Sequence, residues 1–377
     1  MIKGHIRQRG ENSWAIVLDV RDPQTGARRR KWHSFAGNKR DAQAYCARLI
    51  TEMNDGAYVE TDRASLNEFL DRWERDWAAT TVSPKTAERY SELLRMHVRP
   101  ALGNKRMQAI RAEDLNRLYA QLHEKIAPRT IKHVHRLLHR VFGHAAKWHA
   151  IKHNVVALVD SPKVPPTEAA VLQATEIPQM FAALRGREFY PIAVLALGTG
   201  LRRGELLALR WQDVDLDGGS LRVERSLEET GKGLRFKAPK SARSRRTISL
   251  APAVISELRD HWRAQQKQRL ALGLGKAPAE GLVFAKYDGA PFSPDRLSGD
   301  FARATNGAGL PHVTLHTLRH THASQLIAAG VDILTISRRL GHHSAALTLT
   351  VYGHLLASED RAADITQAMF AAAGIGQ

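Results

Sequence analysis

Apolar and polar residues alternate near the start of the chain. In the segment SWAIVLDV, the side chains of Trp14, Ile16, Leu18 and Val20 fall on one face of a predicted strand. The turn-forming sequence DPQTG follows, and after it comes a second strand, rich in Arg and Lys, over residues 28–35. A short helix is predicted over residues 39–53. The pattern therefore predicts a small α+β domain over residues 1–60.

Helical spacing replaces the alternation over residues 64–158. Apolar side chains recur at helical spacing from Leu66 to Trp77. Ser83 and Pro84 read as an N-cap followed by a helix-starting proline, and this helix is expected to end before Pro100. Apolar residues predict two further helices, over residues 115–122 and 128–145. The region reads as an all-α bundle of about four helices.

A proline-rich linker, SPKVPP, separates this bundle from the third region, residues 168–377. That region mixes helices with strands predicted at residues 220–224, 233–237 and 246–250. It reads as a mostly α domain with a small antiparallel β-sheet. The fold class expected for the chain is multidomain, with an α+β, an all-α and a mostly α domain in that order.

The net charge of the chain indicates which class of molecule it binds. The 377 residues include 56 Lys and Arg against 38 Asp and Glu, which gives a formal net charge of +18. An excess of this size favours a polyanion such as DNA, since phosphate contacts release counterions. The basic strand at residues 28–35 either enters a DNA groove or is a solvated charged face.

Other sequence features favour a cytoplasmic location without a membrane partner. The longest apolar runs fall short of the roughly 18 residues that a membrane span needs, and the first residues lack the apolar core of a secretory signal. The chain has one cysteine, Cys46. A single cysteine is too few for an intramolecular disulfide or for a zinc site built from several thiolates.

Candidate chemistry gathers in the third region. In TGLRRGELL, a glycine-containing turn places Arg202 at a predicted helix start, and Glu205 follows three residues later. An arginine in this position can fork onto phosphate oxygens. In KAPKSARSRRTISL, Lys240 lies at the tip of a predicted hairpin. Taken alone, Arg202 also reads as a surface cation and Lys240 as part of a solvated basic loop.

Three more segments carry titratable groups. His316 and Arg319 lie three residues apart in HTLRHTHAS, so one helix face presents both. His342 follows in LGHHS, and Tyr352 lies in TVYGH. A single tyrosine is more often a packing residue than a nucleophile. Only the combination of these segments makes a catalytic interpretation strong.

The histidines around residue 316 raise the question of a metal site. His316 and His320 have the i, i+4 spacing of a helical metal pair, with His312 and His322 nearby. No carboxylate lies between them. We therefore expect no metal site and no cofactor.

In this order and spacing, the segments resemble the active-site motifs of the tyrosine recombinase family, which includes the phage-type integrases. The first arginine box is TGLRRGELLALRW, the hairpin lysine lies in PKSARSRRTISL and the H-x-x-R box is HTLRHTHAS. LGHHS supplies the third basic position, and Tyr352 follows ten residues after His342. No expected position is substituted. The resemblance covers the whole chain, since the bundle looks like a core-binding domain and residues 1–60 look, more weakly, like an arm-binding domain.

The resemblance implies a site-specific DNA recombinase that cuts and rejoins strands through a 3′-phosphotyrosine on Tyr352. Arg202 and Arg319 would hold the scissile phosphate, with Glu205 ordering the arginines. His342 would add a hydrogen bond, His316 would serve as general base and Lys240 as general acid. The division of acid and base between His316 and Lys240 stays open. The covalent link conserves bond energy, so the mechanism implies neither ATP nor Mg²⁺.

Family membership further implies double-stranded DNA with core and arm sites as the partner, a homotetramer on that DNA, and accessory DNA-bending or directionality proteins. A tail helix over residues 358–372 would dock on a neighbouring protomer or on its own domain. Integration or excision of a mobile element is the favoured function. A resolvase of chromosome or plasmid dimers, a type IB topoisomerase and a non-enzymatic DNA-binding protein are the alternatives.

Overall fold

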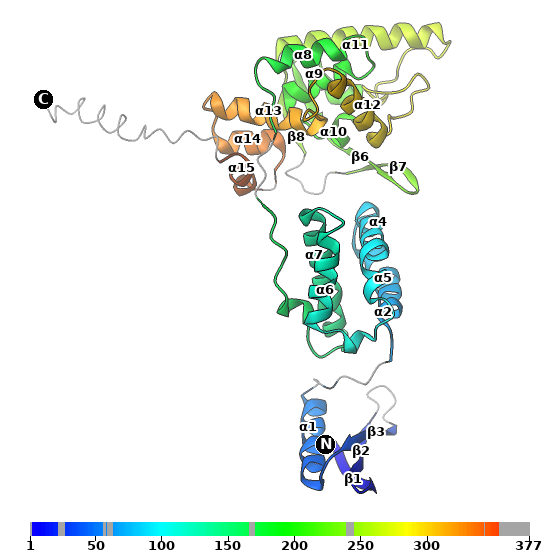
Figure 1. Cartoon of the computed structure of the whole chain (residues 1–377). Helices are drawn as coiled ribbons and strands as arrows, with labels where there is room; N and C mark the ends of the chain where they lie inside the picture. Colours follow the sequence, from blue (N-terminus) through cyan, green and yellow to red (C-terminus); the bar gives the residue numbers. More distant parts are fainter. Residues whose placement is uncertain are drawn as a thin grey trace, which may run out of the picture. The chain divides into compact units, whose positions relative to one another are not determined.

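The computed structural model of the chain describes residues 2–21, 27–55, 58, 63–165, 170–238, 245–342 and 344–353. The chain divides into two compact units, Met1–Pro165 and Pro166–Gln377, which are described in turn (Figure 1). Among the described helices, none combines the length and the apolar character that crossing a membrane requires.

The first unit begins with a three-stranded antiparallel sheet and one helix. The strands are β1 (Lys3–Gly10), β2 (Ser13–Arg21) and β3 (Arg28–Ala36), in the order β1-β2-β3. Helix α1 (Lys39–Asn54) packs against β1 and β2, and its side chains share a small core with the central strand (Figure 1). The predicted basic strand and the predicted helix both form.

The predicted strand forms as β2, and both of its faces are buried. Ile16 and Leu18 lie in the core that α1 covers, but Ala15 and Val17 are buried as well. The reason is that β2 is the central strand, so its residues are flanked on both sides. Val17, for example, lies between His5 of β1 and Trp32 of β3.

The rest of the first unit is helical, and its apolar stripes form one buried cluster. Its elements are α2 (Leu66–Trp73), the π-helical η1 (Glu74–Ala78), α3 (Ala79–Thr81), α4 (Pro84–Leu93), the π-helical η2 (Leu94–Val98), α5 (Arg99–Leu102), the 3₁₀ turn η3 (Met107–Ala109), α6 (Ala112–His123), α7 (Pro128–Lys147) and the 3₁₀ turn η4 (Val155–Leu158).

One predicted boundary in the bundle is wrong, because helical structure continues past Pro100. Proline lacks an N–H and clashes with the carbonyl four residues before it, which normally ends or kinks a helix. Here the π-helical turn η2 widens the ladder just before Pro100, and the N–H of Arg99 reaches back five residues to the carbonyl of Leu94. The wider turn accommodates the proline.

The second unit is mostly helical with two small antiparallel sheets, β4-β5-β8 and β6-β7. Its elements are α8 (Glu176–Leu184), α9 (Tyr190–Thr199), α10 (Arg203–Leu206), the 3₁₀ turn η5 (Trp211–Asp213), β4 (Val214–Asp215), β5 (Ser220–Val223), β6 (Ser226–Thr230), β7 (Gly233–Lys237), β8 (Arg246–Ser249), α11 (Pro252–Ala271), α12 (Pro294–Gly307), α13 (Leu315–Ala328), α14 (Ile333–Leu340) and α15 (Ala345–Tyr352). The predicted strands correspond to β5, β7 and β8, whereas β4 and β6 were not predicted.

The ends of two helices, α9 and α14, lie against a third helix, α13, in this unit. Helix α13 packs against α9 and α14 (Figure 1). Gly200 is the C-cap of α9 and Gly341 is the C-cap of α14, and both are in the left-handed conformation, with φ of 68° and 65°. Such glycine caps turn the chain sharply without a Cβ penalty. The two turns direct the last carbonyls of α9 and α14 toward α13.

Candidate active site

Arg319 lies at the centre of the site and is buried, with 2% of its surface exposed. Its two terminal nitrogens donate to the carbonyl oxygens of Gly200 (2.6 Å) and Leu340 (2.8 Å). Burial, followed by the charge of Arg202, lowers the pKa of this guanidinium. Neutral carbonyls fix its orientation but do not cancel its charge, so the position is ready to receive an anion.

Arg202 is the N-cap of α10 and is joined to Arg319 through the same two turns. Its Nη1 donates to Glu205 Oε1 (3.0 Å) and its Nη2 to the carbonyl of Gly341 (2.9 Å). The Arg202 side chain remains 40% exposed. Both terminal nitrogens of this guanidinium are therefore anchored, while its exposed side remains open to solvent or a ligand.

The buried carboxylate of Glu205 binds a second arginine, Arg246, which contacts it at 2.9 and 3.2 Å. Burial acts to raise the pKa of Glu205, but the hydrogen bonds and charge of Arg246, and then the charge of Arg202, outweigh it and the pKa is lowered. Two guanidinium groups thus share one carboxylate, and Arg319 is held by neutral carbonyls, which leaves the site with an excess of positive charge.

Arg246 was not predicted as a site residue from the sequence. A signal was present: in the strand RTIS, Arg246 shares a face with Ile248, which is 1% exposed. An arginine on the inward face of a strand needs a buried acceptor, and Glu205 provides it.

Tyr352, at the end of α15, is buried, with 1% of its surface exposed. Its hydroxyl oxygen lies 2.7 Å from Nδ1 of His320 on α13. Burial raises the pKa of Tyr352 to about 12, although the charge of Arg319 acts in the opposite direction. The phenol is therefore close enough to Arg319 to sense its charge, and it is protonated at neutral pH.

His316 and His342 lie at the edges of the same site. The ring of His316 meets the ring of His320 edge to face, with centroids 4.5 Å apart. Burial, with the charges of Arg319 and Arg202, lowers the pKa of His316. Nδ1 of His342 lies 2.7 Å from Oγ1 of Thr348 on α15, the helix that carries Tyr352.

Two predictions fall outside the described residues. Lys240 lies between β7 and β8, in residues 239–244, and the predicted tail helix lies in residues 354–377. In the part of the chain that the structure describes, no cluster of three or more His, Cys, Asp or Glu side chains is arranged to hold a metal ion. His312 instead lies 3.5 Å from the carboxylate of Glu176.

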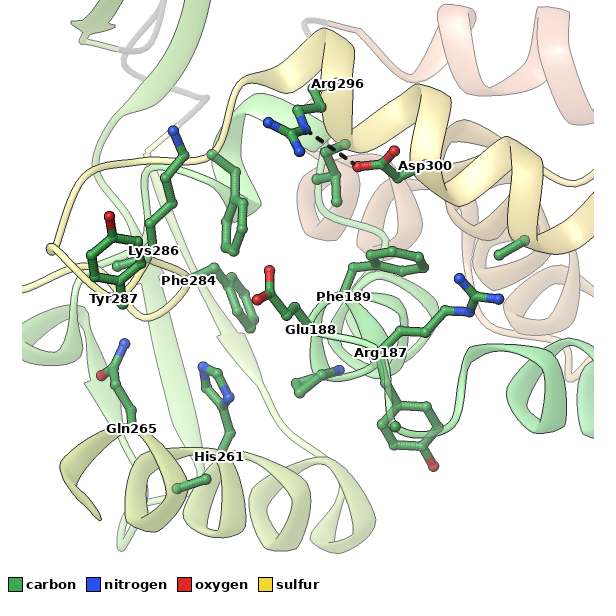
Figure 2. Close-up of a pocket in the computed structure, with 18 of the residues that line it drawn as sticks. Arg187, Glu188, Phe189, His261, Gln265, Phe284, Lys286, Tyr287, Arg296 and Asp300 are labelled. Atoms are coloured by element: carbon green, nitrogen blue, oxygen red, sulfur yellow. Dashed lines mark ion pairs between the residues drawn. The ribbon is translucent and has the colours of Figure 1, made fainter. Parts of the chain in front are cut away.

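A separate cavity of about 1000 Å³ lies elsewhere in the second unit. Figure 2 shows the aromatic rings of Phe189 and Phe284 beside the cavity, together with the ion pair of Arg296 and Asp300 (3.8 Å). None of the predicted site residues that the structure describes lines it. The arginine cluster around Arg319 is therefore distinct from this cavity.

Residues 170–359, just over half of the chain, match the model of the phage integrase family. The chain belongs to this family. Residues 65–123 also match the N-terminal SAM-like domain of phage integrases. The family's members are tyrosine recombinases, and this chain is accordingly an integrase-type enzyme that carries out site-specific recombination of DNA by breaking and rejoining strands.

Curated relatives cover much of the chain. The tyrosine recombinase XerC-like protein of Caldanaerobacter subterraneus subsp. tengcongensis is 26% identical over 94% of this chain and 95% of its own length. An integrase of Streptomyces ambofaciens is 31% identical over 74% of each protein. Both carry the recombinase or integrase name that the family match indicates.

Solved structures share the fold at low identity. The integrase of the transposon Tn1549, in complex with transposon right end DNA, is 21% identical with a TM-score of 0.67, over 80% of this chain and 98% of that one. A lambda integrase tetramer bound to a Holliday junction is 21% identical with a TM-score of 0.57, over 88% of this chain and 91% of that one.

Proposed function

We propose that Tyr352 is the nucleophile of this integrase and that it forms a 3′-phosphotyrosine with the DNA strand it cleaves. The observation that carries the proposal is a site with three arginines and a single carboxylate, Glu205, which pairs with Arg202 and Arg246 and leaves Arg319 without an acidic partner. The Tyr352 phenol is close enough for Arg319 to affect its pKa. A scissile phosphodiester would supply the missing negative charge.

The remaining roles follow from the positions of the groups. Arg319 and Arg202 hold the non-bridging phosphate oxygens, where charge builds in the transition state. Glu205 keeps Arg202 and Arg246 in place. His316 and His342 lie at the edges of this cluster as further donors, and Lys240 protonates the leaving 5′-oxygen. A 5′-hydroxyl of a partner strand then attacks the phosphotyrosine and completes the exchange.

Each of the three predicted regions has a separate function on DNA. Residues 1–60 bind arm-type sites, residues 64–158 bind the core site and residues 168–377 carry out catalysis. The basic strand β3, with Arg28, Arg29, Arg30 and Lys31, supports the first assignment, and the SAM-like match at residues 65–123 supports the second. Phosphate contacts would supply most of the affinity, which would fall steeply with salt.

The biological role proposed is integration or excision of a mobile element by four protomers on two DNA segments, with accessory DNA-bending proteins. Relatives named as integrases support the role, and the DNA-bound tetramer of lambda integrase supports the assembly.

The nucleophile is tested with Tyr352→Phe. Only the phenolic oxygen is removed, so the variant should bind DNA as the wild type does but form no covalent protein–DNA adduct on a nicked suicide substrate in denaturing gels. Tyr190→Phe, at the start of α9, is a matched control and should still form the adduct. An adduct with Tyr352→Phe would place the nucleophile elsewhere.

A further inference from the structure

The hydroxyl of Tyr352 has a defined partner. Its oxygen lies 2.7 Å from Nδ1 of His320, and the two rings meet at 61° with centroids 5.5 Å apart. The contact joins α13 to α15 and is sheltered, since Tyr352 is almost completely buried. No hydrogen bond joins His316 to Tyr352 within the described residues. The imidazole in contact with the nucleophile is therefore that of His320.

The groups that face His320 keep it neutral at rest. His316 and Arg319 come from its own helix, and Tyr352 comes from α15. Burial first, and then the charges of His316 and Arg319, lower the pKa of His320 to about 4. A neutral imidazole has one free nitrogen, and with its proton on Nε2 the free nitrogen is Nδ1. In this tautomer the phenol donates its hydrogen bond to Nδ1.

We propose that His320, rather than His316, is the general base that removes the phenolic proton of Tyr352 during strand cleavage. The inference rests on the proposed assignment of Tyr352 as the nucleophile. His320 is a catalytic residue in this scheme because it touches the reacting oxygen. His316, one turn earlier on α13, is left to interact with the phosphate.

The step balances in atoms and charge. The Tyr352 oxygen forms a bond to phosphorus as its proton passes to Nδ1 of His320, and the bond between phosphorus and the 5′-oxygen breaks. The departing oxygen takes a proton from a general acid, for which Lys240 is proposed. His320 becomes a cation, and the bound phosphate, which carries negative charge in the ground state and the transition state, stabilises it. At rest the same transfer is unfavourable, because no such anion is present.

The test separates proton transfer from positioning with His320→Asn and His320→Ala. The Asn amide oxygen reproduces a hydrogen-bond acceptor near the position of Nδ1 but is not a base. We expect both variants to bind DNA normally and to cleave a suicide substrate about 10²–10⁴-fold more slowly in single turnover. The matched control is His316→Asn, a substitution one helical turn away on α13. His320→Asn should lose the acidic limb of the pH–rate profile, whereas His316→Asn should keep it.

A more acidic nucleophile gives a second measurement. Replacing Tyr352 with a fluorinated tyrosine weakens the need for a base, so it should restore much of the rate of His320→Asn and little of the rate of Arg319→Lys. Cleavage by His320→Asn at the wild-type rate, or with an unchanged acidic limb, would overturn the inference. Failure of the proposed function is seen separately, as a covalent adduct formed by Tyr352→Phe.

Discussion

At the scale of single residues, the site is governed by a charge imbalance. Arg202 and Arg246 both bind the one buried carboxylate of Glu205, whereas Arg319 is oriented by carbonyl oxygens instead of by an acid. Glu205 therefore has two effects: it stabilises the fold by pairing two arginines, and it leaves enough positive charge for a phosphate. A second carboxylate would stabilise the cluster further but would repel the substrate.

Replacing this carboxylate with the isosteric amide in Glu205→Gln should lower the free energy of unfolding by about 3 kcal/mol, since it leaves partly buried guanidinium groups unpaired. The folded-state pKa of Glu205 lies below the ordinary value of 4.5. Its contribution is therefore present above pH 4.5 and is lost as the pH falls through the folded-state pKa. Urea titrations at several pH values measure both effects. Equal stabilities of variant and wild type would contradict this account.

At the scale of elements, the ends of helices build the site more than their middles do. Gly200 ends α9 with a φ of 68°, and its carbonyl accepts from Arg319 at 2.6 Å. A Cβ at this position would lie 2.7 Å from Leu340 and 2.8 Å from His322. Gly200 is thus fixed both by its backbone conformation and by close packing. Because its carbonyl holds Arg319, any shift of Gly200 also moves Arg319.

Gly200→Ala should reduce cleavage strongly while leaving the helices of the first unit unaffected. Gly186→Ala is the matched control, because Gly186 also has a positive φ, of 77°, but a Cβ there meets nothing within 4 Å. Both variants carry a backbone cost of about 1 kcal/mol, which thermal unfolding measures. Only Gly200→Ala should lose single-turnover activity, and equal activity of the two variants would show that the cap does not position Arg319.

At the scale of the whole molecule, separate buried clusters indicate separately folding parts. The sheet and α1 share one apolar cluster, the helices from α2 to η4 share another, and the second unit has its own. Because each part has its own buried apolar cluster, we expect each to fold without the others. The proposed arm-binding, core-binding and catalytic functions are therefore separable by truncation.

Deleting residues 1–60 should abolish binding to arm-type sites and leave core-site cleavage intact. The deletion removes β3 and its four consecutive basic residues, so the salt dependence of binding to long DNA should also become shallower. Gel-shift titrations on arm and core duplexes at two salt concentrations measure this, together with adduct formation on the core substrate. Loss of core-site binding would mean that residues 1–60 belong functionally to the helical region.

Local patterns in the sequence determined many of the elements and several site positions. Helical spacing marked the apolar stripes of the bundle, and the glycine-containing turn before Arg202 placed it at a helix start. These features depend on neighbours within a few residues, which the sequence itself contains. The central position of β2 was missed because it depends on which strands pair on either side of it. The π-helical turn before Pro100 was missed because it departs from the local rule that proline ends a helix.

The sequence by itself determined the chemical groups available: two arginine boxes, a histidine pair one turn apart and a tyrosine after them. Only the tertiary structure decided which groups touch. It joined Arg246 to Glu205 across 41 positions of the chain and His320 to Tyr352 across 32. The physical reason is that pattern within an element reveals which way a side chain points, whereas contact between elements depends on how their buried faces pack together.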